Sequence, residues 1–151
     1  MVQYLRTYVL RMVYDTVLRK LDYLLISLHI KNFAIINEVE VFFKNHLNIL
    51  TGETGAGKSI IIDSINYALG AKASKDIIRR GADFALIELV FETKRPMVHK
   101  AMAELDIPVE DNLIIISRKI MQTRSIYKLN GENVTGSTVS SIAELDRKSV
   151  V

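Results

Sequence analysis

Apolar and polar residues alternate along the chain after residue 24. Isoleucine and leucine at positions 26, 28 and 30 are separated by serine, histidine and lysine, and after Asn32 apolar residues recur at 39, 41 and 43. A period of two is typical of strands that bury one face and expose the other. The pattern predicts two half-buried strands paired antiparallel, with Ile26, Leu28 and Ile30 sharing one face.

A short strand-like run, 47–51, then leads into a segment with a helical period. Apolar residues at 61, 65, 68 and 69 fall on one face of a helix, and Gly70 is suited to end that helix. Further strands are predicted at 84–92, 113–120 and 125–130, with Asn130-Gly131 as a hairpin turn.

Two shorter helices complete the pattern. Residues 97–105 follow Pro96, which favours a first helical turn, and residues 139–145 follow Ser137 and Thr138, either of which suits an N-terminal cap. Many strands thus surround a single strand–loop–helix unit. The predicted fold class is α/β, with a P-loop core beside an antiparallel β-subdomain.

Residues 1–23 follow a different pattern. Apolar residues at roughly helical spacing share this segment with Arg6, Arg11, Arg19 and Lys20. Such a basic amphipathic stripe is found in membrane-contacting helices and transit peptides, but two aspartates and the absence of serine weaken a transit role. An ordinary solvated helix, or sequence upstream of the true start, is the simpler interpretation.

Composition narrows the class of protein only modestly. A chain of 151 residues suits one domain or one lobe of a larger one, and 49% apolar residues suffice for a core. The formal charge of +3 permits contact with nucleic acid without arguing for it. Because there is no cysteine, disulfide frameworks and thiolate metal sites are excluded. No apolar run approaches the ~18 residues of a membrane span and no secretory signal is recognisable, which predicts a cytoplasmic protein.

Residues 52–59 carry the strongest chemical signal. Their sequence matches the phosphate-binding loop pattern G-x-x-x-x-G-K-[ST], between a strand-like run and a helix. Glycines let backbone N–H groups curl around an anion, and the helix N-terminus adds partial positive charge. Lys58 is expected to reach the β- and γ-phosphates, and Ser59 to place its hydroxyl on Mg²⁺. The predicted nucleotide-binding residues are Gly52, Glu53, Thr54, Gly55, Ala56, Gly57, Lys58 and Ser59.

Segments on both sides of this loop resemble the N-terminal part of the RecN family of bacterial DNA repair proteins, relatives of the SMC proteins. The segments that carry the resemblance are Leu28–Ile35, Thr51–Ser59, Ile78–Ala82, Ser117–Ile120, Arg124-Ser125 and Leu129–Gly131. It covers residues 24–145, whereas residues 1–23 and 146–151 have no counterpart and are expected to be an extension and a tail at a truncation.

The resemblance implies the N-terminal lobe of an ABC-type, SMC-like ATPase head. In that family a long coiled coil splits the head, and the second half carries the signature motif, the acidic Mg²⁺ strand and the catalytic glutamate. Two heads enclose ATP during double-strand-break repair at the nucleoid. The implied cofactors are ATP and Mg²⁺, and the implied partners are DNA, the second half of the head and a second head.

Chemistry beyond phosphate binding is not visible in the sequence. No hydrophobic strand ends in Asp-Glu, because Glu88 and Glu92 only alternate with apolar residues. Gln122 is a candidate γ-phosphate sensor, but it stands in a predicted hairpin loop, where glutamine is ordinarily just solvated. No catalytic residue is therefore predicted, and whether this chain is itself an enzyme stays open. We expect ATP binding without efficient turnover.

Basic residues in the second half of the chain are candidates for DNA contact. They are Arg79, Arg80, Arg118, Lys119, Arg124 and Lys128, and a solvated basic face is the alternative for each of them. Two other interpretations of the whole chain remain. One is a head lobe of an SMC, RecF-like or transporter ATPase, and the other is an inert or purely structural fragment.

Overall fold

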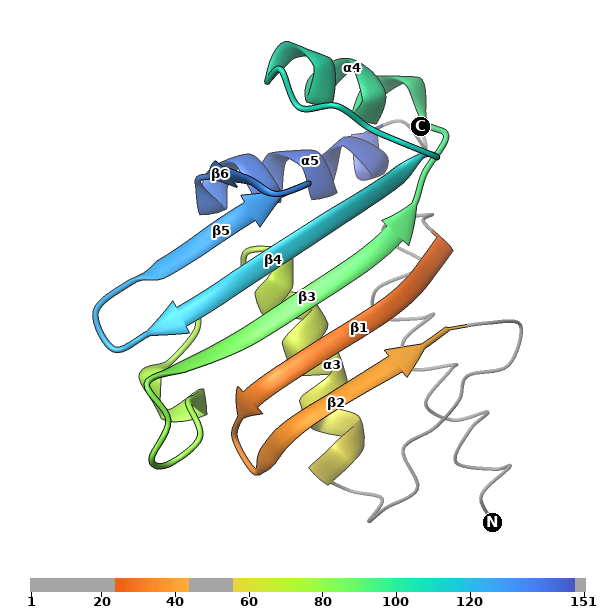
Figure 1. Ribbon diagram of the computed structural model, residues 1–151. Helices are drawn as coiled ribbons and strands as arrows, with labels where there is room; N and C mark the ends of the chain where they lie inside the picture. Colours follow the sequence, from red (N-terminus) through yellow and green to blue (C-terminus); the bar gives the residue numbers. More distant parts are fainter. Residues whose placement is uncertain (1–23, 44–55, 149–151) are drawn as a thin grey trace.

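The computed structural model describes residues 24–43 and 56–148. This part of the chain is built on one antiparallel six-stranded sheet with the strand order β2-β1-β3-β4-β5-β6 (Figure 1). The strands are β1 (Leu24–Phe33), β2 (Ile36–Phe42), β3 (Phe84–Glu92), β4 (Leu113–Met121), β5 (Ser125–Leu129) and β6 (Glu132–Val134). The strands predicted in these ranges are confirmed, whereas the predicted strand at 47–51 and the segment 1–23 lie outside the described residues.

One face of the sheet is buried because apolar residues alternate along its strands. In β3, Ala85, Ile87, Leu89 and Phe91 are at most 1% exposed, as their shared parity predicts. β4 runs beside β3 with Leu89 opposite Ile116, so the buried row continues from strand to strand.

The start of β1 departs from the predicted alternation. Leu25 pairs with Phe91 and Ser27 with Val90, which leaves Ile26 as an extra residue in the ladder. Leu25 is therefore 2% exposed, whereas Ile26 is only half-buried. The prediction that Ile26 shares the face of Leu28 is wrong, because a bulge reverses the parity of the residues that precede it.

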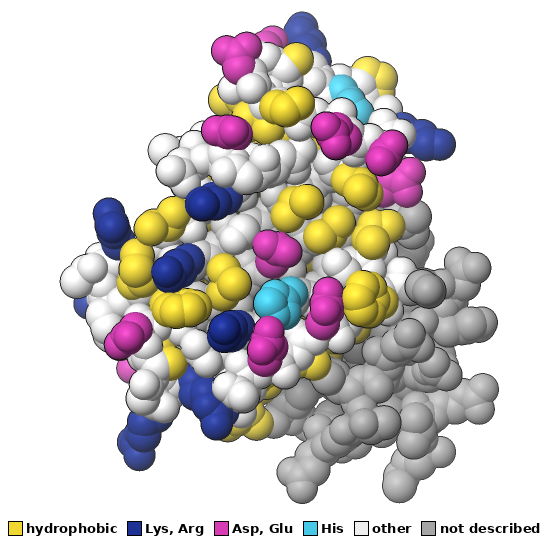
Figure 2. All heavy atoms as spheres, in the orientation of Figure 1, with side chains coloured by type: hydrophobic (Ala, Val, Ile, Leu, Met, Phe, Trp, Pro, Cys, Tyr) yellow, Lys and Arg dark blue, Asp and Glu magenta, His cyan; other side chains and the backbone are white. Residues whose placement is uncertain are grey.

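Three α-helices and one 3₁₀ helix accompany the sheet in the described part. α3 (Ala56–Ala68) and α5 (Gly136–Lys148) lie against one face, α4 (Pro96–Glu104) packs beside α5, and η2 (Lys75–Ile77) precedes β3. The opposite face of the sheet, seen in Figure 2, carries none of these helices. We call the two faces the covered face and the open face. None of the described helices is long and apolar enough to cross a membrane.

α5 begins earlier than its predicted start at residue 139. The Thr138 N–H donates to Thr135 Oγ1 at 3.1 Å, so Thr135 is the N-cap. The prediction of Ser137 or Thr138 for this role is wrong. α4, in contrast, begins at Pro96 and matches its predicted range within one residue.

Candidate nucleotide-binding site

α3 begins inside the predicted phosphate loop. Residues 52–55 lie outside the described part, and residues 56–59 form the first turn of α3, where only the backbone is described. The first N–H groups of a helix have no partner within the helix and carry partial positive charge. The helix expected after the loop is therefore confirmed, and its first turn has the backbone donors that an anion needs.

The centre of α3 is fixed on the covered face of the sheet. Ile61, Ile65 and Ala68 are at most 4% exposed, as predicted from their spacing, and the helix packs on β3 and β4. Ser64 is buried among them, and its Oγ donates to the Ile61 carbonyl at 2.7 Å. This apolar contact sets the direction in which the N-terminus of α3 points.

The C-terminal end of α3 is closed by Gly70, which has a φ of +107°. The Gly70 N–H donates to the Tyr67 carbonyl at 3.2 Å, and the Ala71 N–H donates to the Asn66 carbonyl at 3.1 Å. These are the two hydrogen bonds of a Schellman motif, whose left-handed residue is usually glycine. The predicted helix stop at Gly70 is confirmed.

Arg118 lies beside this same end of the helix. It is 7% exposed, and its Nη1 donates to the carbonyls of Tyr67 and Ala71 at 2.9 and 2.5 Å. Its Nε donates to Ser125 Oγ at 3.2 Å, and its Cζ lies 4.7 Å from the centroid of the Tyr127 ring. A side chain buried in this way is not available to DNA on the surface, so we leave Arg118 out of the proposed DNA contacts.

Burial also shifts the titration of this pair. Desolvation lowers the pKa of the Arg118 guanidinium, and interaction with Tyr127 and Tyr67 partly opposes that shift. Burial raises the pKa of Tyr127, and the positive charge of Arg118 counteracts it. Because arginine is not deprotonated in proteins, a positive charge stands permanently at the C-terminal end of α3.

The exposed basic candidates gather at one end of the sheet. Phe84, the first residue of β3, pairs with Met121, the last residue of β4, so the loop before β3 and the β4–β5 turn are neighbours. Arg80 is exposed in that loop and Arg124 in that turn. Gln122 is exposed in the same turn, as its predicted hairpin position requires. In Figure 2, Lys and Arg side chains gather towards the left and lower left of the open face.

Two further basic residues border this end, and a third, Lys128, pairs with Ser117 further along the sheet. Arg79 Nη1 donates to the Ile35 carbonyl at 2.6 Å, which joins the loop to the β1–β2 turn. Lys119 Nζ lies 4.4 Å from the centroid of the Phe84 ring, on the open face. Lys128 is exposed on β5. We call Arg79, Arg80, Lys119 and Arg124 the basic edge.

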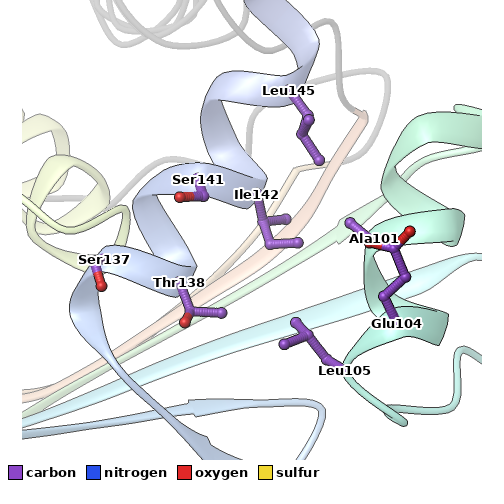
Figure 3. A pocket seen from close by; sticks show the side chains of 8 residues that line it. All are labelled: Ala101, Glu104, Leu105, Ser137, Thr138, Ser141, Ile142 and Leu145. Carbon is purple, nitrogen blue, oxygen red and sulfur yellow. The ribbon is translucent and has the colours of Figure 1, made fainter.

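A cavity of about 360 Å³ opens between α4 and α5 (Figure 3). Ala101 and Leu105 line one side, Ile142 and Leu145 line the other, and serine and threonine hydroxyls border it. Glu104 is the only charged residue of the lining. Phosphate binding calls for cationic or N–H donors, so this cavity does not suit a nucleotide.

Comparison with known proteins places the chain in a family. Residues 27–150 match the family model described as AAA domain. The chain belongs to this AAA domain family. Because the match includes residues 52–59 and every described helix and strand from β2 onward, the phosphate loop and its sheet are parts of one domain of that family.

Several similar curated proteins are DNA repair proteins called RecN. The protein from Halalkalibacterium halodurans is 46% identical over 115 residues, which cover 74% of this chain and 20% of that protein. The protein from Bacillus subtilis is 42% identical over 127 residues, covering 82% of this chain and 21% of that protein. The predicted resemblance to the N-terminal part of RecN is confirmed, and this AAA domain chain spans about a fifth of the relatives' length.

A similar solved structure is the Smc head domain from Pyrococcus furiosus, crystallised with an extended coiled coil and the C-terminal domain of ScpA. It superimposes with a TM-score of 0.60 at 25% identity, covering 80% of this chain and 32% of that chain. The predicted fold, an SMC-like ATPase head lobe, is confirmed.

Proposed function

We propose that this chain is the ATP- and Mg²⁺-binding N-terminal lobe of a RecN-like DNA repair ATPase. The observation that carries the proposal is the phosphate loop sequence, which leads directly into a helix anchored on the sheet. The free N–H groups of the first turn of α3 suit phosphate oxygens. Lys58 supplies a cation for the β- and γ-phosphates, and Ser59 supplies a hydroxyl ligand for Mg²⁺. Bound Mg²⁺ would neutralise charge on the phosphates.

The two carboxylates of β3, Glu88 and Glu92, do not complete a hydrolytic site. Glu88 and Glu92 have the parity of Val90 and lie on the open face, whereas α3 lies on the covered face. A catalytic carboxylate has to reach the γ-phosphate, so neither residue suits that role. Binding without efficient turnover is therefore the proposed activity of this chain. The second half of an SMC-like head, and a second head, are the partners proposed for hydrolysis.

DNA is the proposed partner of the basic edge. Arg80 and Arg124 are exposed there, and Arg79 and Lys119 are held beside them by the contacts described above. Arginine and lysine on a surface bind the phosphate backbone without regard to sequence, which suits repair at breaks of any sequence. This role would place the protein with the chromosomal DNA of the cytoplasm.

The decisive experiment compares Lys58→Ala with Lys72→Ala by isothermal titration with ATP and Mg²⁺. Lys72 is an exposed lysine beyond the opposite end of α3 and serves as the matched control. Losing one charge-assisted phosphate contact should weaken binding about 10- to 150-fold in Lys58→Ala, with no change in Lys72→Ala. Equal affinities in the two variants would contradict the loop assignment. Absence of ATP binding by the unmodified chain would favour a purely structural lobe, and ATP hydrolysis that Lys58→Ala abolishes would contradict binding without turnover.

A further inference from the structure

Among the side chains that the structure describes, Arg118 is the only charged one that is buried. A buried charge is costly unless it is matched by hydrogen bonds or an opposite charge. Among the described residues its hydrogen-bond acceptors are neutral oxygens: the Tyr67 carbonyl in the last turn of α3, the Ala71 carbonyl just after it and the hydroxyl of Ser125. The Tyr127 ring adds a cation–π contact. The chain thus retains a buried cation whose matching partial charge is the negative C-terminal end of the phosphate-loop helix.

These contacts act on the position of α3 along its own axis. Packing of Ile61, Ile65 and Ala68 holds the helix against the sheet, and the hydrophobic effect behind this packing has no preferred direction. The two hydrogen bonds from Arg118 are directional; one reaches the Tyr67 carbonyl in the last turn of α3, and the other reaches the Ala71 carbonyl just beyond the helix. They oppose movement along the axis.

Movement at one end of α3 reaches the other end. A helix of 13 residues is roughly 20 Å long and is stiff along its axis, because its hydrogen bonds run in that direction. A slide at Tyr67 therefore displaces the N–H groups of the first turn by the same amount. Phosphate binding depends on donor positions at the level of ~0.5 Å, so the two ends are mechanically linked.

We infer that Arg118 is a positioning residue for the nucleotide site: its guanidinium sets the axial position of α3 and thereby the affinity for nucleotide phosphates. This inference rests on the proposed binding of ATP at the phosphate loop. It assigns Arg118, which stands beside Lys119 in the sequence, to the nucleotide side of the molecule and not to the DNA side.

The test measures ATP affinity in the full chain with Mg²⁺, for Arg118→Met and Arg118→Lys, at a temperature where circular dichroism shows each variant folded. Arg118→Met should bind ATP about tenfold more weakly, and Arg118→Lys about threefold more weakly because it keeps the charge but loses the fork of donors. Leu129→Ala is the stability control, because Leu129 is fully buried in β5, which packs on α5. It should lower the melting temperature and leave ATP affinity unchanged.

Unchanged ATP affinity in both Arg118 variants, with a lower melting temperature, would overturn the inference and leave Arg118 a structural residue. If Arg118→Met does not fold, Arg118→Lys decides alone, and wild-type affinity in that variant overturns the inference. Equal weakening in Leu129→Ala would also overturn it, because stability would then control binding. If Lys58→Ala loses ATP binding while the two Arg118 variants bind like the unmodified chain, only the positioning role is refuted. If the unmodified chain does not bind ATP, the proposed function itself is refuted.

Discussion

Arg118 and Lys119 are consecutive basic residues on β4, yet they belong to opposite faces of the sheet. Arg118 is 7% exposed on the covered face and bonds to the end of α3. Lys119 lies on the open face over the ring of Phe84. Of these two adjacent cations, Arg118 therefore makes a buried contact with the phosphate-loop helix, whereas Lys119 belongs to the basic edge.

The sequence contains a signal for this division. Ile114, Ile116 and Ile120 are buried, and Arg118 has their parity, whereas Lys119 has the parity of the half-buried residues between them. A cation at a core position of a strand is costly and therefore marks a structural or functional contact. Arg118 and Lys119 look alike by residue type and by their place in the family-like segment. Only the alternation of buried and exposed positions along the strand shows that they lie on opposite faces.

The largest effect that tests the contrast is expected at Gly70, on the covered side. A Cβ at this residue would lie 2.2 Å from Ser140 Oγ, and the φ of +107° is unfavourable for any other residue. Gly70→Ala should lower the free energy of unfolding by about 2–3 kcal/mol, from backbone strain and overpacking together. Chemical denaturation measures this loss.

Gly81→Ala is the matched control for that substitution. Gly81 has a φ of +89°, but a Cβ added there would meet no atom within 4 Å, so only the strain of about 1 kcal/mol is expected. Adding Ser140→Ala to Gly70→Ala should recover part of the loss, because it removes the clashing oxygen. Equal costs at the two glycines would show that packing against α5 does not constrain the end of α3.

Local features of the fold were predictable where a few neighbouring residues decide them. Asn130 and Gly131 have φ values of 48° and 86°, as a two-residue hairpin turn requires, and Gly70 ends α3. The loop pattern alone predicted a P-loop core, and the family resemblance added its assignment to an SMC-like ATPase head. Two features were missed because they depend on distant partners: the bulge at Ile26, set by pairing with β3, and the burial of Arg118 under α3. The cap at Thr135 is local, and it was missed because Ser137 and Thr138 are equally good capping residues by type.

An intermediate effect is expected on the open side, at the basic edge. Arg80→Ala with Arg124→Ala should lower DNA affinity about tenfold and reduce the slope of log affinity against log salt by about 2, because each phosphate contact contributes about 0.9. The control pair is Lys94→Ala with Lys100→Ala, two exposed lysines that follow β3 at the opposite end of the sheet. Fluorescence anisotropy with a DNA duplex at several salt concentrations measures both quantities. Equal losses in the two double variants would mean that net charge, and not the basic edge, controls binding.

The smallest effect is expected at Glu38, also on the open side. Its Oε1 lies 2.8 Å from His29 Nε2, and this hydrogen bond, with help from the charge of Lys31, lowers the pKa of the Glu38 carboxyl. Because this pKa is lowered in the folded state, ionised Glu38 stabilises the fold fully at pH values above 4.5, the ordinary pKa of the carboxyl. The contribution is lost as the pH falls through the lowered pKa. Glu38→Gln should therefore be slightly less stable than the unmodified chain at pH 7, and in urea unfolding the gap should close as the pH falls below 4.5 and through the lowered pKa. A gap that stays constant with pH would exclude the ionised pair as its cause. Because water solvates both groups, this pair should contribute far less than the buried contacts of Arg118, although its 2.8 Å hydrogen bond falls within their range of lengths.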